Sequence, residues 1–258
     1  MHLRPVTNAV LFQLRRAMPR LRRASYSERL EATDEHLAKQ TLLPNLVGAA
    51  LSEPTLRLNL FYGWVLEQLP IERTERGETP YRAIDLGSKD FIYAPALAAS
   101  LAVWFDQFEL IGLELDPYRL INNLHRRGDC ARYYVEQACR SIQPGSSVRY
   151  AQGDWLKQIP GERYDLITCF FPFIYSDLHD RFGLPRSGFS PRRFYEKCCV
   201  EGDRLILFHQ SKQELHDSIA LLDEIGGGSI EFQGSFQKNP WLKRQHPVEV
   251  LIWKRHKS

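Results

Sequence analysis

The chain has 258 residues, of which 43% are hydrophobic and 25% are charged, and its net charge at neutral pH is +3. This length fits one large α/β domain, or one domain of about 180 residues with a helical extension, and no apolar run approaches the roughly 20 residues of a membrane-spanning helix. The five cysteines form neither a CxxC pair nor a cysteine–histidine cluster, so we expect no metal site and reduced thiols in a cytoplasmic protein.

The N-terminus is strongly basic. Residues 1–30 contain seven arginines and one acid, Glu28. These arginines are either solvated and internally paired, or they contact nucleic acid, anionic lipid or an acidic substrate. Arg15 and Arg16 interrupt the short apolar run before them, which is unlike a signal peptide; an organelle transit peptide is the remaining targeting alternative.

Residues 1–78 are predicted to form a helical extension that caps a second part, residues 79–258. Leu56, Leu60 and Trp64 recur every four residues, which predicts an amphipathic helix that ends near residue 70. The polar stretch that follows this helix is the expected boundary between the two parts.

After residue 80, short apolar strands alternate with helical stretches. This alternation predicts βαβ units in a mainly parallel, Rossmann-like sheet of seven strands with helices on both faces. The last two strands leave no room for a crossover helix, so we expect an antiparallel C-terminal hairpin. The expected strands are 81–86, 108–114, 147–152, 164–171, 203–209, 229–236 and 247–254.

Acids and a glycine turn stand at the ends of the first two strands. Asp85 and Gly87 end the first strand, where a glycine turn at the carboxyl edge of the sheet lets the backbone approach a ligand, although an ordinary turn has the same pattern. Glu114 ends the second strand, and its two oxygens match a vicinal diol. Asp116 either caps the following helix or shares that contact.

The ends of the third and fourth strands carry polar and aromatic residues. Asp154 and Trp155 could bind the amine and the ring of adenine, or Asp154 could cap a helix. Phe171, Pro172 and Tyr175 follow the fourth strand; they line a pocket or belong to the core, and aromatic faces favour a positively charged ligand group.

The candidates for proton transfer after the fourth strand are Tyr175, Asp177, His179 and Asp180. The imidazole of His179 titrates near neutral pH and could act as a general base, although a surface histidine is the alternative. Asp177 and Asp180 flank it, and His209 at the end of the fifth strand is a second candidate base.

Together these segments resemble the class I S-adenosylmethionine-dependent methyltransferase superfamily, over roughly residues 80–255. The resemblance implies an enzyme that binds S-adenosylmethionine and methylates a small or medium organic acceptor. By resemblance, Asp85 with Gly87 contacts the methionine part, Glu114 binds ribose, Asp154 with Trp155 binds adenine, and Phe171 to Tyr175 face the acceptor. Ser88, Lys89 and Asp116 are additional candidates for the cofactor site.

The chain departs from the superfamily pattern at two points. The first loop has a single glycine, so it is either wider than usual or binds the methionine carboxylate with side chains, for which Lys89 is the candidate charge partner. Phe171-Pro172-Phe173 offers no amide or carboxylate to hold a target nitrogen, which disfavours N-methylation of nucleobases or glutamine. A dinucleotide site is disfavoured because the loop lacks G-x-G-x-x-G.

Two alternatives stay open. The same pocket could break another carbon–sulfur bond of the cofactor, by aminocarboxypropyl transfer or by a cyclisation that releases methylthioadenosine. The arginine-rich N-terminus could instead belong to an RNA-modifying or RNA-binding protein.

Overall fold

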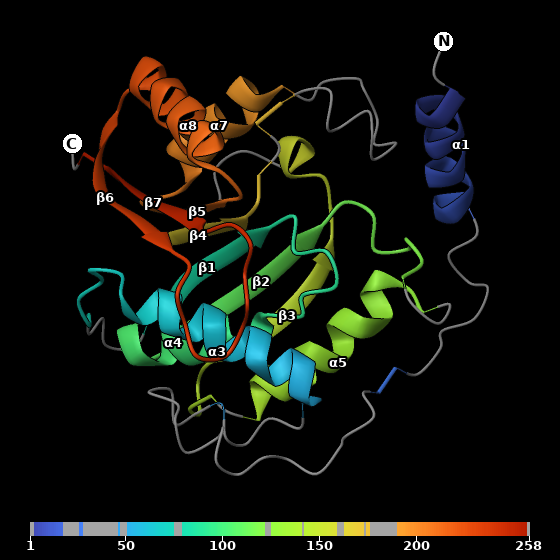
Figure 1. Ribbon diagram of the computed structural model, residues 1–258, viewed down its shortest axis with the longest axis horizontal. Coiled ribbons are helices and arrows are strands. Elements are labelled where there is room, and N and C mark those ends of the chain that lie inside the picture. Colours follow the sequence, from blue (N-terminus) through green and yellow to red (C-terminus); the bar gives the residue numbers. More distant parts are fainter. Residues whose placement is uncertain are drawn as a thin grey trace.

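The computed structural model describes residues 3–17, 26–27, 46, 51–74, 79–121, 125–140, 142–158, 163–172, 174–175 and 190–256. These residues form a seven-stranded sheet in the order β3-β2-β1-β4-β5-β7-β6 (Figure 1). The strands are β1 (Tyr81–Leu86), β2 (Phe108–Glu114), β3 (Ser147–Gln152), β4 (Leu166–Phe170), β5 (Arg204–His209), β6 (Gly228–Phe236) and β7 (Val248–Arg255).

The first five strands run parallel to one another, whereas β7 is antiparallel to both β5 and β6. The predicted mainly parallel sheet with an antiparallel C-terminal hairpin is therefore confirmed. β4 is shorter than predicted: Tyr164 makes an isolated bridge with Gly202, and a side-chain oxygen of Asp165 accepts from the backbone N–H of Arg82 at 2.9 Å.

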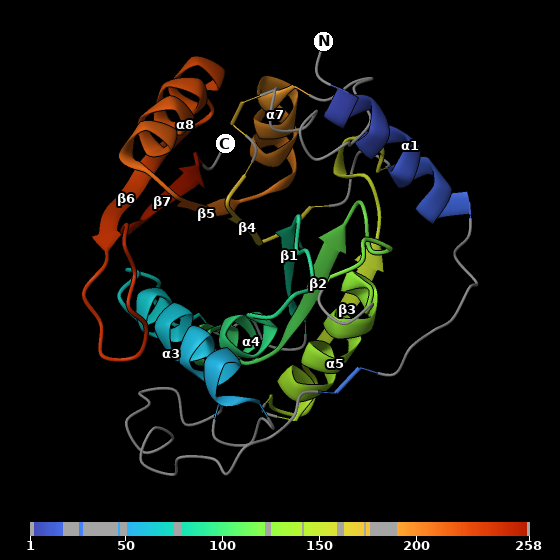
Figure 2. The ribbon, with the colours of Figure 1, turned by 45° about the vertical axis from the view of Figure 1, so that its right-hand side comes forward.

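Helices cover both faces of the sheet (Figure 2). One layer contains α3 (Glu53–Glu67), α4 (Ala94–Trp104) and α5 (Arg127–Cys139), and the other contains α7 (Pro191–Glu201) and α8 (Lys212–Ile225). Alternate side chains of β5 separate the two cores: Ile206 and Phe208 pack toward the first layer, and Leu205 and Leu207 toward the second. Both faces of the central strands are thus buried.

The predicted amphipathic helix is α3, and a buried asparagine joins it to the next helix. The Asn59 side-chain amide donates to the backbone carbonyl of Ile92 at 2.9 Å, and its carbonyl accepts from the backbone N–H of Ala96 at 2.9 Å. Because α3 shares one continuous core with α4 and the sheet, it fixes the start of α4, which follows the loop after β1.

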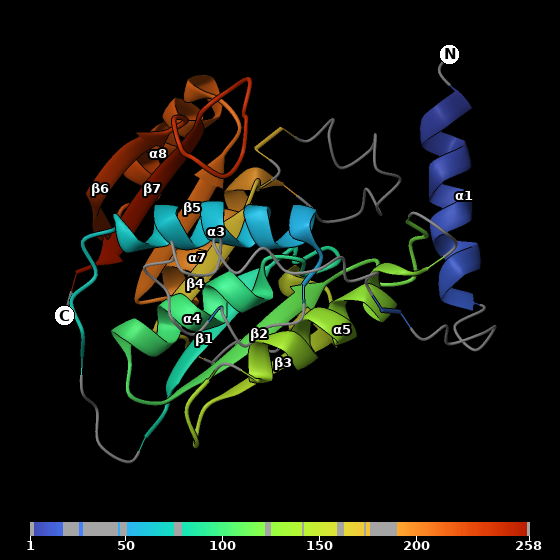
Figure 3. The ribbon, with the colours of Figure 1, turned by 60° about the horizontal axis from the view of Figure 1, so that its bottom comes forward.

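The N-terminal helix α1 (Leu3–Ala17) lies at the periphery, apart from both helical layers (Figure 3). Among the described residues, no helix has the length and apolar character that crossing a bilayer requires.

Candidate functional site at the carboxyl edge of the sheet

The loop between β1 and α4 turns sharply at the carboxyl edge. Gly87 has φ +70°, and its N–H donates to the Leu113 carbonyl on β2 at 2.9 Å. A Cβ at Gly87 would have no atom within 4 Å, so the space above this backbone is open. Lys89 and Phe91 also have positive φ, and the Phe91 ring fills the space over Gly112. The loop is therefore closely held underneath and accessible above.

Glu114 is fixed beneath this loop. It is 5% exposed, and one oxygen accepts from the Lys89 backbone N–H at 2.9 Å. The other oxygen accepts from the Asp116 backbone N–H at 2.8 Å and from the Arg127 guanidinium at 3.1 Å. A carboxylate has about four acceptor positions, so these three donors leave room for a further hydroxyl.

The Arg127 contact with Glu114 is not apparent from the sequence. Arg127 occupies the first turn of α5, and both partners are largely buried, with side-chain exposures of 14% and 6%. A ligand that binds Glu114 would therefore also meet this guanidinium.

Asp85 lies below the loop and has no exposed surface. Its two oxygens accept hydrogen bonds from the Tyr93 hydroxyl at 2.8 Å and from Thr168 at 2.7 Å. Burial raises the pKa of Asp85 to about 7, although both of these hydrogen bonds act in the opposite direction. In this conformation Asp85 joins β1, β4 and the start of α4, and it does not offer the direct ligand contact that was expected.

Ser88 and Lys89 differ sharply in accessibility. Ser88 is fully buried, and its hydroxyl donates to the Asp85 carbonyl at 2.9 Å. Lys89 is exposed, and its ammonium lies 5.6 Å from the centroid of the Phe171 ring. Of these two residues, Lys89 is the one that can meet an anionic ligand group.

Asp116 contacts the N-terminal helix. One carboxylate oxygen accepts from the Arg15 guanidinium at 2.7 Å, and the other has no hydrogen-bond partner within the described part of the chain. The side chain is fully buried in this contact. Pro117 begins a turn and not a helix, so Asp116 is not a helix cap, and in this conformation its side chain is buried against Arg15.

Asp154 and Trp155 begin the short 3-10 helix η3 (Trp155–Lys157). The Asp154 side chain caps η3 by accepting from the Leu156 N–H at 3.1 Å, which is the helix-cap alternative, and it is 27% exposed. The Trp155 ring is buried in the second core, with Lys197 5.0 Å from its centroid. The ring therefore does not face the carboxyl edge.

The backbone turns at Phe171, directly after β4. Phe171 has φ +64° and is half-buried, and its N–H donates to the Phe208 carbonyl at 2.8 Å; Pro172 is buried. The Tyr175 hydroxyl donates to Asp217 of α8 at 2.7 Å, which raises the tyrosine pKa to about 12. This raised pKa does not favour Tyr175 as a base near neutral pH. His179, Asp177 and Asp180 lie outside the described residues.

His209 ends β5 beside Phe171. It has no exposed surface, and within the described residues both ring nitrogens lack a hydrogen-bond partner. Burial lowers the pKa of His209 to about 4, so the imidazole is neutral near pH 7.

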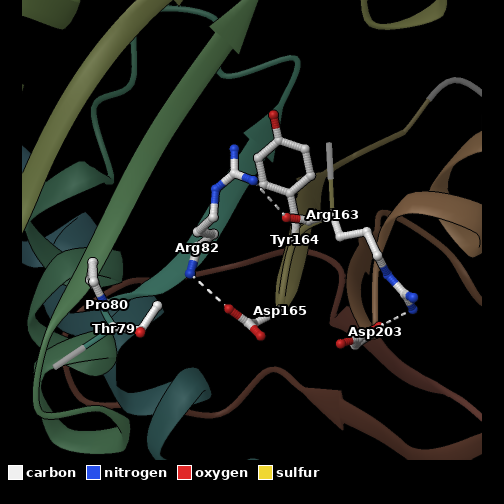
Figure 4. Close-up of a pocket in the computed structure, with 7 residues that line it drawn as sticks. All are labelled: Thr79, Pro80, Arg82, Arg163, Tyr164, Asp165 and Asp203. Atoms are coloured by element: carbon white, nitrogen blue, oxygen red, sulfur yellow. Dashed lines mark hydrogen bonds and ion pairs between the residues drawn. The ribbon is translucent and has the colours of Figure 1, made fainter. Parts of the chain in front are cut away.

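A cavity of about 570 Å³ opens at the opposite, amino edge of the sheet (Figure 4). Its cations are engaged: the Arg82 guanidinium lies 5.0 Å from the Tyr164 ring centroid, and Arg163 pairs with Asp203 at 2.9 Å. The lining residues are Thr79, Pro80, Arg82, Arg163, Tyr164, Asp165 and Asp203. None of the residues predicted from the sequence for the site lines this cavity.

Comparison with known proteins finds no matching family model and no matching curated protein. The solved structures that are similar include a magnesium protoporphyrin IX methyltransferase from Synechocystis with bound S-adenosylhomocysteine (SAH), at 14% identity, TM-score 0.48 and 98% of each chain covered.

Two further similar structures are named as methyltransferases. One is a human methyltransferase 10 domain containing protein, with 14% identity, TM-score 0.48, and 85% of this chain and 97% of that one covered. The other is the N-methyltransferase NodS from Bradyrhizobium japonicum with SAH, with 13% identity, TM-score 0.46, and 80% and 89% covered. All three TM-scores are below 0.5.

Proposed function

We propose that the protein is a class I S-adenosylmethionine-dependent methyltransferase acting in the cytoplasm on a small or medium organic acceptor. The observation that carries the proposal is the junction of the open Gly87 turn with Glu114, whose carboxylate accepts the Lys89 backbone N–H at 2.9 Å. This junction combines a close backbone approach, an exposed cation and a carboxylate that can accept one further hydroxyl at the carboxyl edge, where open α/β sheets bind ligands.

The accessible side chains fit the parts of S-adenosylmethionine. Glu114 would accept a ribose hydroxyl, Lys89 would pair with the methionine carboxylate, and Asp154, with 27% of its side chain exposed, would accept the adenine amine. The half-buried Phe171 would face the sulfonium. When bound, the cofactor supplies a methyl group already activated for displacement, so this chain's residues mainly orient the partners and exclude water.

We assign the enclosed residues supporting roles. Asp85 and Ser88 hold the loop from below, and Trp155 supports η3 from the core. The strand order also favours this cofactor over a dinucleotide: it departs from the 3-2-1-4-5-6 order of dinucleotide-binding sheets because the antiparallel β7 lies between β5 and β6.

Titration calorimetry with SAH tests the cofactor assignment. Glu114→Gln is expected to weaken binding by about 1.5 to 3 kcal/mol, the scale for losing a hydrogen bond to a charged group. Glu109→Gln, at an exposed position of the same strand, is the matched control and should bind like the wild type. If folded wild-type protein binds neither S-adenosylmethionine nor SAH, the proposal is wrong.

Product analysis then separates the chemistries. Incubation with S-adenosylmethionine and candidate acceptors should yield SAH and a methylated acceptor. Release of methylthioadenosine would instead support aminocarboxypropyl transfer or cyclisation. Methylation of RNA, but of no small molecule, would favour the nucleic-acid alternative.

A further inference from the structure

Helix α1 is anchored to the rest of the protein by one face. Phe12 is 1% exposed, and Arg15, one turn further along, forms the 2.7 Å ion pair with the buried Asp116. These two contacts lie on the same side of the helix, because residues three positions apart are neighbours on a helix surface. The rotation of α1 about its own axis is therefore fixed, and its outer face is defined.

The outer face of α1 is apolar. Val10, Leu11 and Leu14 are 53%, 43% and 47% exposed, although a helix on a globular domain normally directs such side chains inward. Three large aliphatic side chains gathered on the solvent side of one helix indicate an interaction surface.

The segment that contains this apolar face is basic. Arg16 is exposed at the end of α1, where its guanidinium lies 5.5 Å from the centroid of the Phe12 ring, and residues 1–27 contain six arginines and no acid. An apolar face in an arginine-rich segment matches a surface that offers both hydrocarbon and negative charge, which is the interface of an anionic bilayer.

We propose that α1 docks on an anionic phospholipid surface, with Val10, Leu11 and Leu14 inserted among the headgroups. At 15 residues, α1 is shorter than the roughly 20 residues of a membrane span, so it lies in the interface. A nucleic acid would attract the arginines through its phosphates but would leave the aliphatic side chains in water. A second copy of α1 would bring like charges together.

This inference does not depend on the proposed function. The Arg15–Asp116 ion pair places the C-terminal end of α1 beside the end of β2. Docking through α1 would therefore bring the carboxyl edge of the sheet close to the bilayer, whatever the protein binds there.

Vesicle co-sedimentation of the full chain tests the proposal. Wild-type protein should sediment with vesicles of phosphatidylcholine and phosphatidylglycerol, but not with phosphatidylcholine alone. Val10→Ser/Leu14→Ser should lower the partition coefficient by about tenfold or more, since each buried methylene contributes roughly 0.8 kcal/mol. Arg16→Glu should lower it as well, and added salt should have the same effect.

The matched control is Val103→Ser/Val200→Ser, which removes two aliphatic side chains of similar exposure, 47% and 68%, from other helices. It should bind vesicles like the wild type. The proposal is overturned if the wild type does not bind anionic vesicles, or if Val10→Ser/Leu14→Ser binds them as well as the wild type does. Tight binding of tRNA by both the wild type and Val10→Ser/Leu14→Ser would also overturn it. So would a wild-type dimer that Val10→Ser/Leu14→Ser fails to form.

Discussion

Replacing Asp85 by asparagine should change the pH dependence of stability. The folded-state pKa of Asp85 is raised to about 7, against an ordinary value of 3.8, because the carboxyl group is fully buried. Between these two values the unfolded chain releases a proton that the folded chain retains, so wild-type stability falls as pH rises. Below pH 3.8 both states are protonated, and above about pH 7 the loss is complete.

A shift of about three pKa units corresponds to about 4 kcal/mol, at roughly 1.4 kcal/mol per unit. The asparagine side chain of the variant cannot titrate, and its amide can still pair with the Tyr93 and Thr168 hydroxyls. The free energy of unfolding of Asp85→Asn relative to wild type should therefore increase by about this amount from pH 4 to pH 8. Urea unfolding of both proteins across this range measures the difference. A difference that does not vary with pH would refute the reasoning, because Asp85 would then be ionised in the folded state.

Two other substitutions test the carboxyl edge. His209→Gln should reduce the loss of stability at acidic pH. The pKa of His209 is lowered from 6.5 to about 4, so the free energy of unfolding of the wild type falls as pH falls between these values. The loss is about 3 kcal/mol, at roughly 1.4 kcal/mol per pKa unit. Urea unfolding at pH 7 and pH 4.5 checks this. An equal change in the free energy of unfolding between the two pH values in both proteins would contradict it. Gly87→Ala should cost about 1 to 2 kcal/mol of stability, because φ is +70° and no neighbour crowds the added methyl group. Unaltered urea denaturation of the alanine variant would show that the loop relaxes.

The central strands β1, β2, β4 and β5 were predictable because each is a short apolar run whose neighbours bury both of its faces. β1, β2 and β3 have the predicted bounds, and the antiparallel pairing of β7 follows from the short connection before it. β4 was predicted too long at both ends. The apolar pattern continues through Phe171, but there the backbone turns to φ +64° and leaves the sheet.

The position of each site residue was predictable from the sequence, whereas its surroundings were not. The sequence pattern places Asp85 at the end of β1. Because side chains alternate along a strand, Asp85 shares a face with Ala83, which packs in the first core under α4. Tyr93 and Thr168, which enclose it, come from a loop and from another strand. Likewise, Trp155 follows β3 as expected, but packing against α7 directs its ring into the core.

The acids Glu114 and Asp116, at and just after the end of β2, also had surroundings that were not predictable, and this affects how the Glu114→Gln experiment is interpreted. The arginine partner of Glu114 lies 13 residues away in the sequence and that of Asp116 lies 101 residues away, so no local motif predicts either pairing. Because the Arg127–Glu114 pair is largely buried, removing Glu114 alone leaves a cation without its counter-charge, which is itself destabilising. Arg127→Gln separates the two effects. If that variant binds SAH as the wild type does while Glu114→Gln binds it weakly, the carboxylate itself contacts the ligand; if both lose affinity equally, the ion pair acts by holding the Lys89 loop.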